Sequence, residues 1–136
     1  MNVKRFIAAS LAVFVVGQAL NFLIHGVLLQ ATYDSLKQLW RPDMESKMWI
    51  MWLVGFITSF LFTYIFAKGY EGKGIAEGIR FGFVIGLFTS MPMAYGSYVT
   101  LPIPYRLALQ WFLYGTLATM ILGIVVASIY RPAKPV

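Results

Sequence analysis

Three polar residues recur at helical spacing within an apolar stretch near the N-terminus: Gln18, Asn21 and His25. Separations of three and four residues place side chains on one face of a helix. Gln110 and Tyr114 stand four residues apart in a later apolar stretch. Because polar groups are costly in lipid, they usually face a cavity or a neighbouring helix. Two interpretations stay open: a hydrophilic pocket or pathway, and hydrogen bonds that fix helix packing.

His25 is the only histidine of the chain, and histidine is the side chain that ordinarily titrates near neutrality. Any proton or metal chemistry would therefore pass through His25. Met91 and Met93 are weak candidates to bind a metal together with His25, because thioether sulfurs and an imidazole form a soft site suited to Cu(I). Methionine is also an ordinary filler of apolar gaps, and we favour that interpretation. We expect no bound metal and no cofactor.

Several membrane chemistries lack the residues they need. The chain contains no cysteine, which excludes thiol–disulfide exchange and cysteine-bound iron–sulfur clusters. The five acidic residues all lie outside the uncharged runs 6–33, 48–67, 81–105 and 107–130. The carboxylate pair of an intramembrane hydrolase is therefore missing, as are the metalloprotease and phosphate-loop motifs. We expect no catalytic residues and a protein that is not an enzyme.

The composition is that of a membrane protein. Of 136 residues, 60% are apolar and 12% are charged, whereas soluble domains have about 25% charged residues. Each uncharged run reaches the roughly 20 residues that a helix needs to cross a bilayer. The sequence predicts an all-α integral membrane protein, an up-down bundle of four transmembrane helices in a single domain, 1–136. The expected helices lie at about 5–30, 45–67, 77–99 and 105–130, with an interfacial helix at 34–41.

The distribution of lysine and arginine predicts the orientation. With both termini inside the cell, the inner side carries seven basic residues: Lys4, Arg5, Lys68, Lys73, Arg80, Arg131 and Lys134. The outer side carries four: Lys37, Arg41, Lys47 and Arg106. We therefore expect an N-in, C-in, multi-pass protein of a bacterial inner membrane. The net charge of +6 is then a topology signal, and we expect no nucleic-acid partner.

Small residues recur every four positions in the second half of the chain, a glycine-zipper pattern. The first row is Gly74, Gly78, Gly82, Gly86 and Ser90, and the second is Gly115, Thr119, Gly123 and Ala127. Such rows let two helix backbones approach closely in lipid. We favour packing between the last two helices of the chain over an oligomer interface, although the rows could serve both.

The leading functional hypothesis is an accessory or scaffolding subunit that packs in a homo-oligomer or in a larger membrane complex. Its expected partners are the lipid bilayer and either itself or other membrane subunits. The first alternative is a small transporter or channel whose pathway follows Gln18, Asn21 and His25. The second alternative is a metal or cofactor site at His25.

Overall fold

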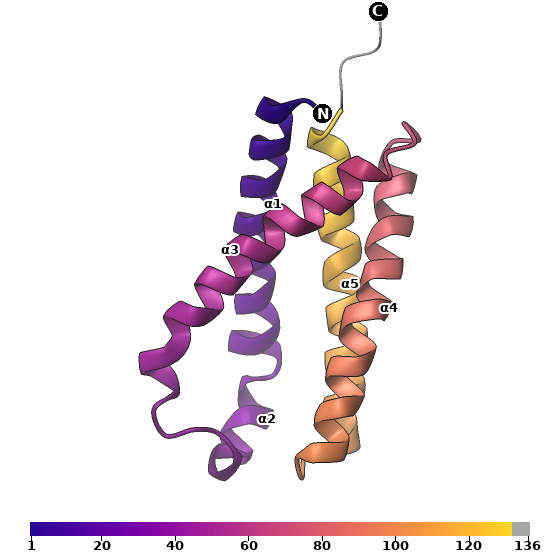
Figure 1. Ribbon diagram of the computed structural model, residues 1–136. Helices are drawn as coiled ribbons and strands as arrows, with labels where there is room; N and C mark the ends of the chain where they lie inside the picture. Colours follow the sequence, from indigo (N-terminus) through magenta and orange to yellow (C-terminus); the bar gives the residue numbers. More distant parts are fainter. Residues whose placement is uncertain (132–136) are drawn as a thin grey trace, which may run out of the picture.

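A computed structural model describes residues 1–131, which are entirely helical apart from short connections. The four long helices are α1 (Val3–Leu23), α3 (Met44–Lys68), α4 (Ile75–Thr100) and α5 (Tyr105–Ile129). Successive long helices run in opposite directions, so residue 131 lies at the same end of the molecule as the N-terminus (Figure 1). At that end, the guanidinium of Arg5 donates to the carbonyl oxygen of Arg131.

Three of these helices are long and apolar enough to cross a membrane, as in a multi-pass membrane protein. They are Val3–Leu28, which adds a π-helical turn to α1, together with α3 and α5. The predicted fourth apolar span is not among them. Although α4 has 26 residues, glycine, serine, threonine and tyrosine occupy many of its positions. These residue types lower the hydropathy of α4 below that of its neighbours.

The interfacial helix predicted at 34–41 is also displaced. The chain forms α2 (Gln30–Ser35) and then a single 3-10 turn, Lys37–Leu39. α2 ends at Ser35, and the backbone of the next residue, Leu36, leaves the helical region with φ −115° and ψ 23°. From there, Leu36 and Leu39 pack against the apolar cluster at this end of the bundle, and burying them takes precedence over continuing the helix.

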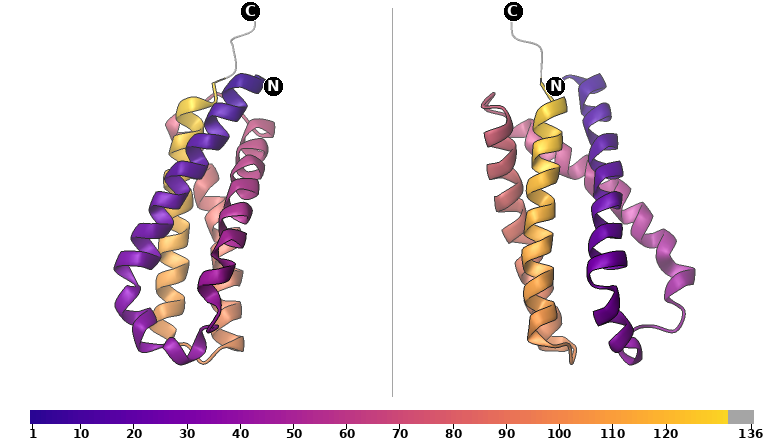
Figure 2. Two further views of the ribbon diagram at one scale, coloured as in Figure 1. Left: turned by 90° about the vertical axis from the view of Figure 1, so that its left-hand side faces the viewer. Right: turned by 180° about the vertical axis from the view of Figure 1, so that it is seen from behind.

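The helices do not pack evenly. α4 lies along α5, whereas α1 packs on both α5 and α3. α3 crosses the bundle on a slant and approaches α4 near the end that carries the chain termini (Figure 1, Figure 2). There the rings of Phe62 and Phe66 pack on Phe81 of α4, at centroid distances of 4.8 and 5.3 Å.

The close approach of α4 to α5 depends on their small residues. Gly78 lies against Gly123, Gly82 against the carbonyl of Thr119, and Ser90 against Gly115. A Cβ atom added at Gly82 would stand only 2.6 Å from the Cα atom of Met120, closer than real Cβ contacts. Gly86, Thr116 and Ala127 belong to the same contact.

Gly74 is the exception in the first row. It is the N-cap of α4, and its φ of +72° lies in the left-handed region that favours glycine. A Cβ atom there would meet nothing within 4 Å. Gly74 therefore shapes the turn before α4 and takes no part in helix packing.

Two apolar clusters stabilise the ends of the bundle. The cluster at the end with the termini includes Val13, Phe66 and Val126. The opposite cluster includes Ile24, Leu29 and Leu107, with Leu29 and Leu107 almost completely buried. A cavity among the helices extends from one cluster to the other, since Val13 of the first and Ile24 of the second both line it.

Candidate functional site

A cavity of about 330 Å³ lies among the four long helices. Apolar side chains form most of its wall, and the polar groups that face it are amides, hydroxyls and one imidazole. Each long helix contributes at least one of these polar groups: Gln18, Asn21, Thr58, Ser59, Ser90, Tyr114 and Thr119, with His25 in the π-helical turn that follows α1. The volume lies at the lower end of the range for sites that bind small molecules.

The structure brings together four of the five residues singled out for a polar pathway. Gln18, Asn21, His25 and Tyr114 all line the cavity. Gln110 is half-buried elsewhere on α5, and Trp111 lines the cavity in its place. The four-residue spacing of Gln110 and Tyr114 allowed a shared face but did not fix which face of α5 meets α1.

The amide of Gln18 faces a position on α3 that has no side chain. A Cβ atom added at Gly55 would stand 2.7 Å from Nε2 of Gln18. Gly55 therefore makes room for this amide beside the cavity. Sequence spacing does not identify this pair, because the residue opposite Gly55 on α1 is a feature of the tertiary packing.

The polar groups of the cavity differ in how far they are already hydrogen-bonded. The hydroxyls of Ser59 and Thr119 donate to carbonyls of their own helices, at 2.8 Å to Gly55 and 2.8 Å to Thr116. Within residues 1–131, the side chains of Gln18, Asn21 and Tyr114 form no hydrogen bond. Two amides and a phenol hydroxyl thus have donors and acceptors available to a bound molecule.

Tyr33 ties the segment after α1 to the rim of the cavity. Its hydroxyl lies 2.6 Å from Nδ1 of His25 and accepts a hydrogen bond of 2.7 Å from Nε1 of Trp111 on α5. Nε1 of Trp40 donates to the backbone carbonyl of Tyr33 at 3.1 Å. Burial raises the pKa of Tyr33, and the hydrogen bond from Trp111 opposes that rise. Tyr33 was not predicted as a site residue, because its partner Trp111 lies 78 residues away in the sequence.

A π-helical turn positions His25 for this contact. The backbone N–H of Leu29 donates to the carbonyl of Ile24, five residues earlier, at 2.9 Å. π-Helical turns are rare and often occur at functional sites. The turn spans Ile24–Leu28 and lets the chain leave α1 so that the ring of Tyr33 stacks on that of His25, at a centroid distance of 5.8 Å.

The residues weighed for a metal site are only partly brought together. His25 and Met93 line the cavity, as does Met51, whereas Met91 does not. Met91 and Met93 diverge because residues two apart point to different sides of a helix. Among residues 1–131, no group of three or more His, Cys, Asp or Glu side chains is arranged to hold a metal ion.

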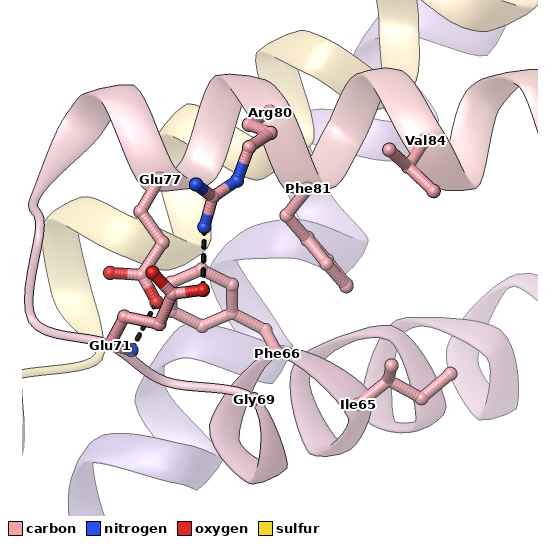
Figure 3. Close-up of a pocket in the computed structure, with 8 residues that line it drawn as sticks. All are labelled: Ile65, Phe66, Gly69, Glu71, Glu77, Arg80, Phe81 and Val84. Carbon is pink, nitrogen blue, oxygen red and sulfur yellow. Dashed lines mark hydrogen bonds and ion pairs between the residues drawn. The ribbon is translucent and has the colours of Figure 1, made fainter.

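A second pocket of about 250 Å³ lies where α3 ends and α4 begins (Figure 3). The buried carboxylate of Glu77 accepts hydrogen bonds from the backbone N–H groups of Glu71 at 2.6 Å and Lys73 at 2.8 Å. Glu71 in turn pairs with Lys73 and with Arg80, the latter at 2.7 Å. These ion pairs lower the pKa of the exposed Glu71 carboxyl, with the Lys73 contact the larger cause.

The Glu77 carboxylate has an evident structural role. Both of its bonds go to the connection between α3 and α4, so it holds this turn against the start of α4. Glu77 was not predicted as a site residue, because a carboxylate that binds backbone N–H groups carries no sequence motif. We therefore take the larger cavity as the candidate functional site.

Comparison with protein-family models, curated proteins and solved structures finds no match to this chain.

Proposed function

We propose that this protein is a four-span membrane protein that binds a small uncharged molecule in its central cavity and moves it within or across the bilayer. The proposal rests on three polar groups that line the cavity: the amides of Gln18 and Asn21 and the hydroxyl of Tyr114. Within residues 1–131, none of them forms a hydrogen bond. Polar groups facing a cavity at membrane depth are a recognised mark of substrate pathways. This proposal takes up the transporter hypothesis.

The proposal includes α4 as a fourth transmembrane helix. α4 packs along α5, which is itself long and apolar enough to span a membrane. A helix of 26 residues is about 39 Å long, which exceeds the hydrocarbon thickness of about 30 Å. Gly78, Gly82 and Ser90 of α4 face α5, and this contact shelters their backbone and hydroxyl atoms from lipid.

The subunit hypothesis retains less support. Its main argument was the pair of small-residue rows, and these rows, apart from Gly74, pack against each other between α4 and α5. A face used within the chain is not available to a partner. Assembly with itself or with other membrane subunits therefore stays a prediction, to be tested by native mass spectrometry in mild detergent.

The proposed function is tested by what co-purifies with the protein. The full chain is isolated in nanodiscs, and small molecules are extracted and measured by mass spectrometry. We expect a species that is present with wild type and reduced about fivefold in Gln18→Leu, which removes one unpaired amide, since losing a hydrogen bond costs about 1 kcal/mol. Gln110→Leu makes the same change outside the cavity and is the matched control.

Equal amounts of every extracted species in the wild type and in both variants would contradict the proposal. A melting experiment on each variant, in the same nanodiscs, checks that the compared proteins are folded. If retention fell equally in Gln18→Leu and Gln110→Leu, the cavity would not be the binding site.

A further inference from the structure

Several lining residues of the cavity are also exposed on the outside of the helices. Met51 and Val54 of α3 and Met93 of α4 line the cavity, although 61%, 49% and 49% of their surfaces are exposed. A side chain that contacts both the cavity and the outer surface lies at an opening. The cavity therefore has a mouth between α3 and α4.

The slant of α3 produces this mouth. α3 meets α4 through Phe62, Phe66 and Phe81 near the end with the termini. Toward the other end the two helices diverge, as Figure 1 and the right-hand view of Figure 2 show. Met51, Val54 and Met93 lie on the diverging part.

The depth of the mouth decides what can reach it. Met51, Val54 and Met93 lie within about 8 Å of the midpoints of their helices, at a rise of about 1.5 Å per residue. The hydrocarbon core extends about 15 Å to either side of the bilayer centre. An opening at this depth, rimmed by thioether and isopropyl groups, faces lipid chains and not water.

The chemistry changes from the mouth to the interior. Behind the apolar rim stand the amide of Gln18, beside Gly55, and the hydroxyl of Tyr114, both half-buried, whereas Asn21 is exposed. These groups are neutral and both donate and accept hydrogen bonds. The complementary molecule has an apolar body and an uncharged polar head, such as a hydroxyl or a carbonyl.

We propose that the cavity takes a neutral, membrane-soluble amphipathic molecule, which enters sideways from the bilayer between α3 and α4 and places its polar head at Gln18 and Tyr114. This inference rests on the proposed function and adds the ligand class and the route. It excludes a water-soluble solute that enters from the membrane surface.

The test uses three photoreactive probes with the same eighteen-carbon chain, about the length of one bilayer leaflet. Each carries a diazirine on the chain, and they end in a hydroxyl, a carboxylate or a methyl group. The full chain in phosphatidylcholine nanodiscs at pH 8 is irradiated with each probe, and adducts are mapped by peptide mass spectrometry. We expect the alcohol to label residues 51–59 and 90–93 about fivefold more than the other two probes do.

Variants locate the polar head and the mouth. Gln18→Leu should reduce alcohol labelling of these segments about fivefold, whereas Gln110→Leu should leave it unchanged. Val54→Trp should block the mouth, and Val99→Trp is its control because Val99 is 82% exposed on α4 and does not line the cavity. Labelling around Phe88, which is 77% exposed on α4 and does not line the cavity, is the internal reference.

Each other outcome overturns the inference. Equal labelling by all three probes identifies the opening as ordinary lipid-contacting surface. Disulfide capture of a dimer through Val54→Cys, with loss of alcohol labelling in that dimer, identifies a second copy of the chain as the occupant. If the alcohol fails to label while a water-soluble molecule still co-purifies and depends on Gln18, the route is wrong but the proposed function stands. If neither is found, both are wrong.

Discussion

Tyr33 is the residue that joins the most elements at the cavity rim. Its hydroxyl connects His25 in the π-helical turn to Trp111 on α5, and its backbone carbonyl accepts from Trp40. The indole of Trp111 has one donor, and this bond satisfies it. The hydroxyl thus fixes the α2 segment to the bundle, and its hydrogen bonds add to the stability that the ring provides by packing.

We expect Tyr33→Phe to lower the free energy of unfolding by about 1 kcal/mol, because it removes the acceptor for the Trp111 indole and keeps the ring. Reversible unfolding in mixed micelles with increasing dodecyl sulfate measures the change. Tyr98→Phe is the control, since Tyr98 is 43% exposed and lies on α4 away from this cluster. Equal stability of Tyr33→Phe and wild type would show that the hydroxyl contributes nothing.

A second prediction at this scale concerns Glu71. Its carboxyl should titrate below the ordinary value of 4.5, because Lys73 and Arg80 favour the charged form. A carboxyl whose pKa is lowered by folding adds stability above its unfolded-state pKa. That contribution is lost as the pH falls through the lower, folded-state pKa.

Carbon-13 NMR of labelled glutamate, recorded as a pH titration in micelles, gives the midpoint. Lys73→Gln should raise the Glu71 pKa more than Arg80→Gln does, since the Lys73 contact is the larger cause. Lys68→Gln should leave it unchanged, because the Lys68 ammonium lies over the ring of Tyr64. A Glu71 midpoint at or above 4.5 in the wild type would contradict the ion pairs.

At the scale of elements, the α4–α5 pair is the most closely packed part of the molecule. Its backbones touch at Gly78, Gly82 and Gly123, where any side chain would overlap the opposite helix. Because lipid gives no hydrophobic driving force between helices, such contacts contribute much of the stability. α3 has no comparable row against α4 and depends on the rings of Phe62 and Phe66, which leaves the diverging half of α3 apart from α4.

We expect Gly82→Ala to destabilise the folded chain by about 1–3 kcal/mol, since the added methyl would overlap the backbone of Thr119 and force the helices apart. Gly96→Ala makes the same change on the same helix, at a site where a Cβ atom meets nothing within 4 Å. It should be neutral or slightly stabilising, because alanine is the better helix former. Thermal unfolding of both variants in the same detergent gives the comparison, and equal stabilities would contradict this packing.

At the scale of the whole molecule, local signals and tertiary packing determine different features. The observed ends of α3, α4 and α5 differ from the predicted ends by at most two residues, since charges, glycines and prolines such as Pro104 set them. In contrast, α1 ends at Leu23, well before the predicted end at 30, and only the π-helical turn that follows it continues to Leu28. Helical periodicity likewise grouped Gln18, Asn21 and His25 on one face. Three other features depend on residues that are distant in the sequence, and helical periodicity does not predict them. They are the slant of α3, the contact between Gly55 and Gln18, and the position of Trp111, not Gln110, in the cavity wall.

The orientation in the membrane is the remaining whole-molecule prediction. Both described ends of the chain lie at one end of the bundle, and α2 lies at the other (Figure 1). Of the basic residues counted for the inner side, Lys4, Lys68 and Lys73 are at the first end, whereas Lys134 lies outside the described residues. Seven basic residues against four favour that end as the inner one.

Single cysteines can test this without background, because the chain has none of its own. In intact cells, a membrane-impermeant maleimide should label Lys37→Cys and Lys47→Cys. The same reagent should label Lys4→Cys and Lys73→Cys only after the membrane is permeabilised. The expected contrast is near all-or-none, since these side chains lie on opposite sides of a hydrocarbon barrier about 30 Å thick. Reversed labelling at all four positions would invert the topology and place His25 and Tyr33 toward the inner surface.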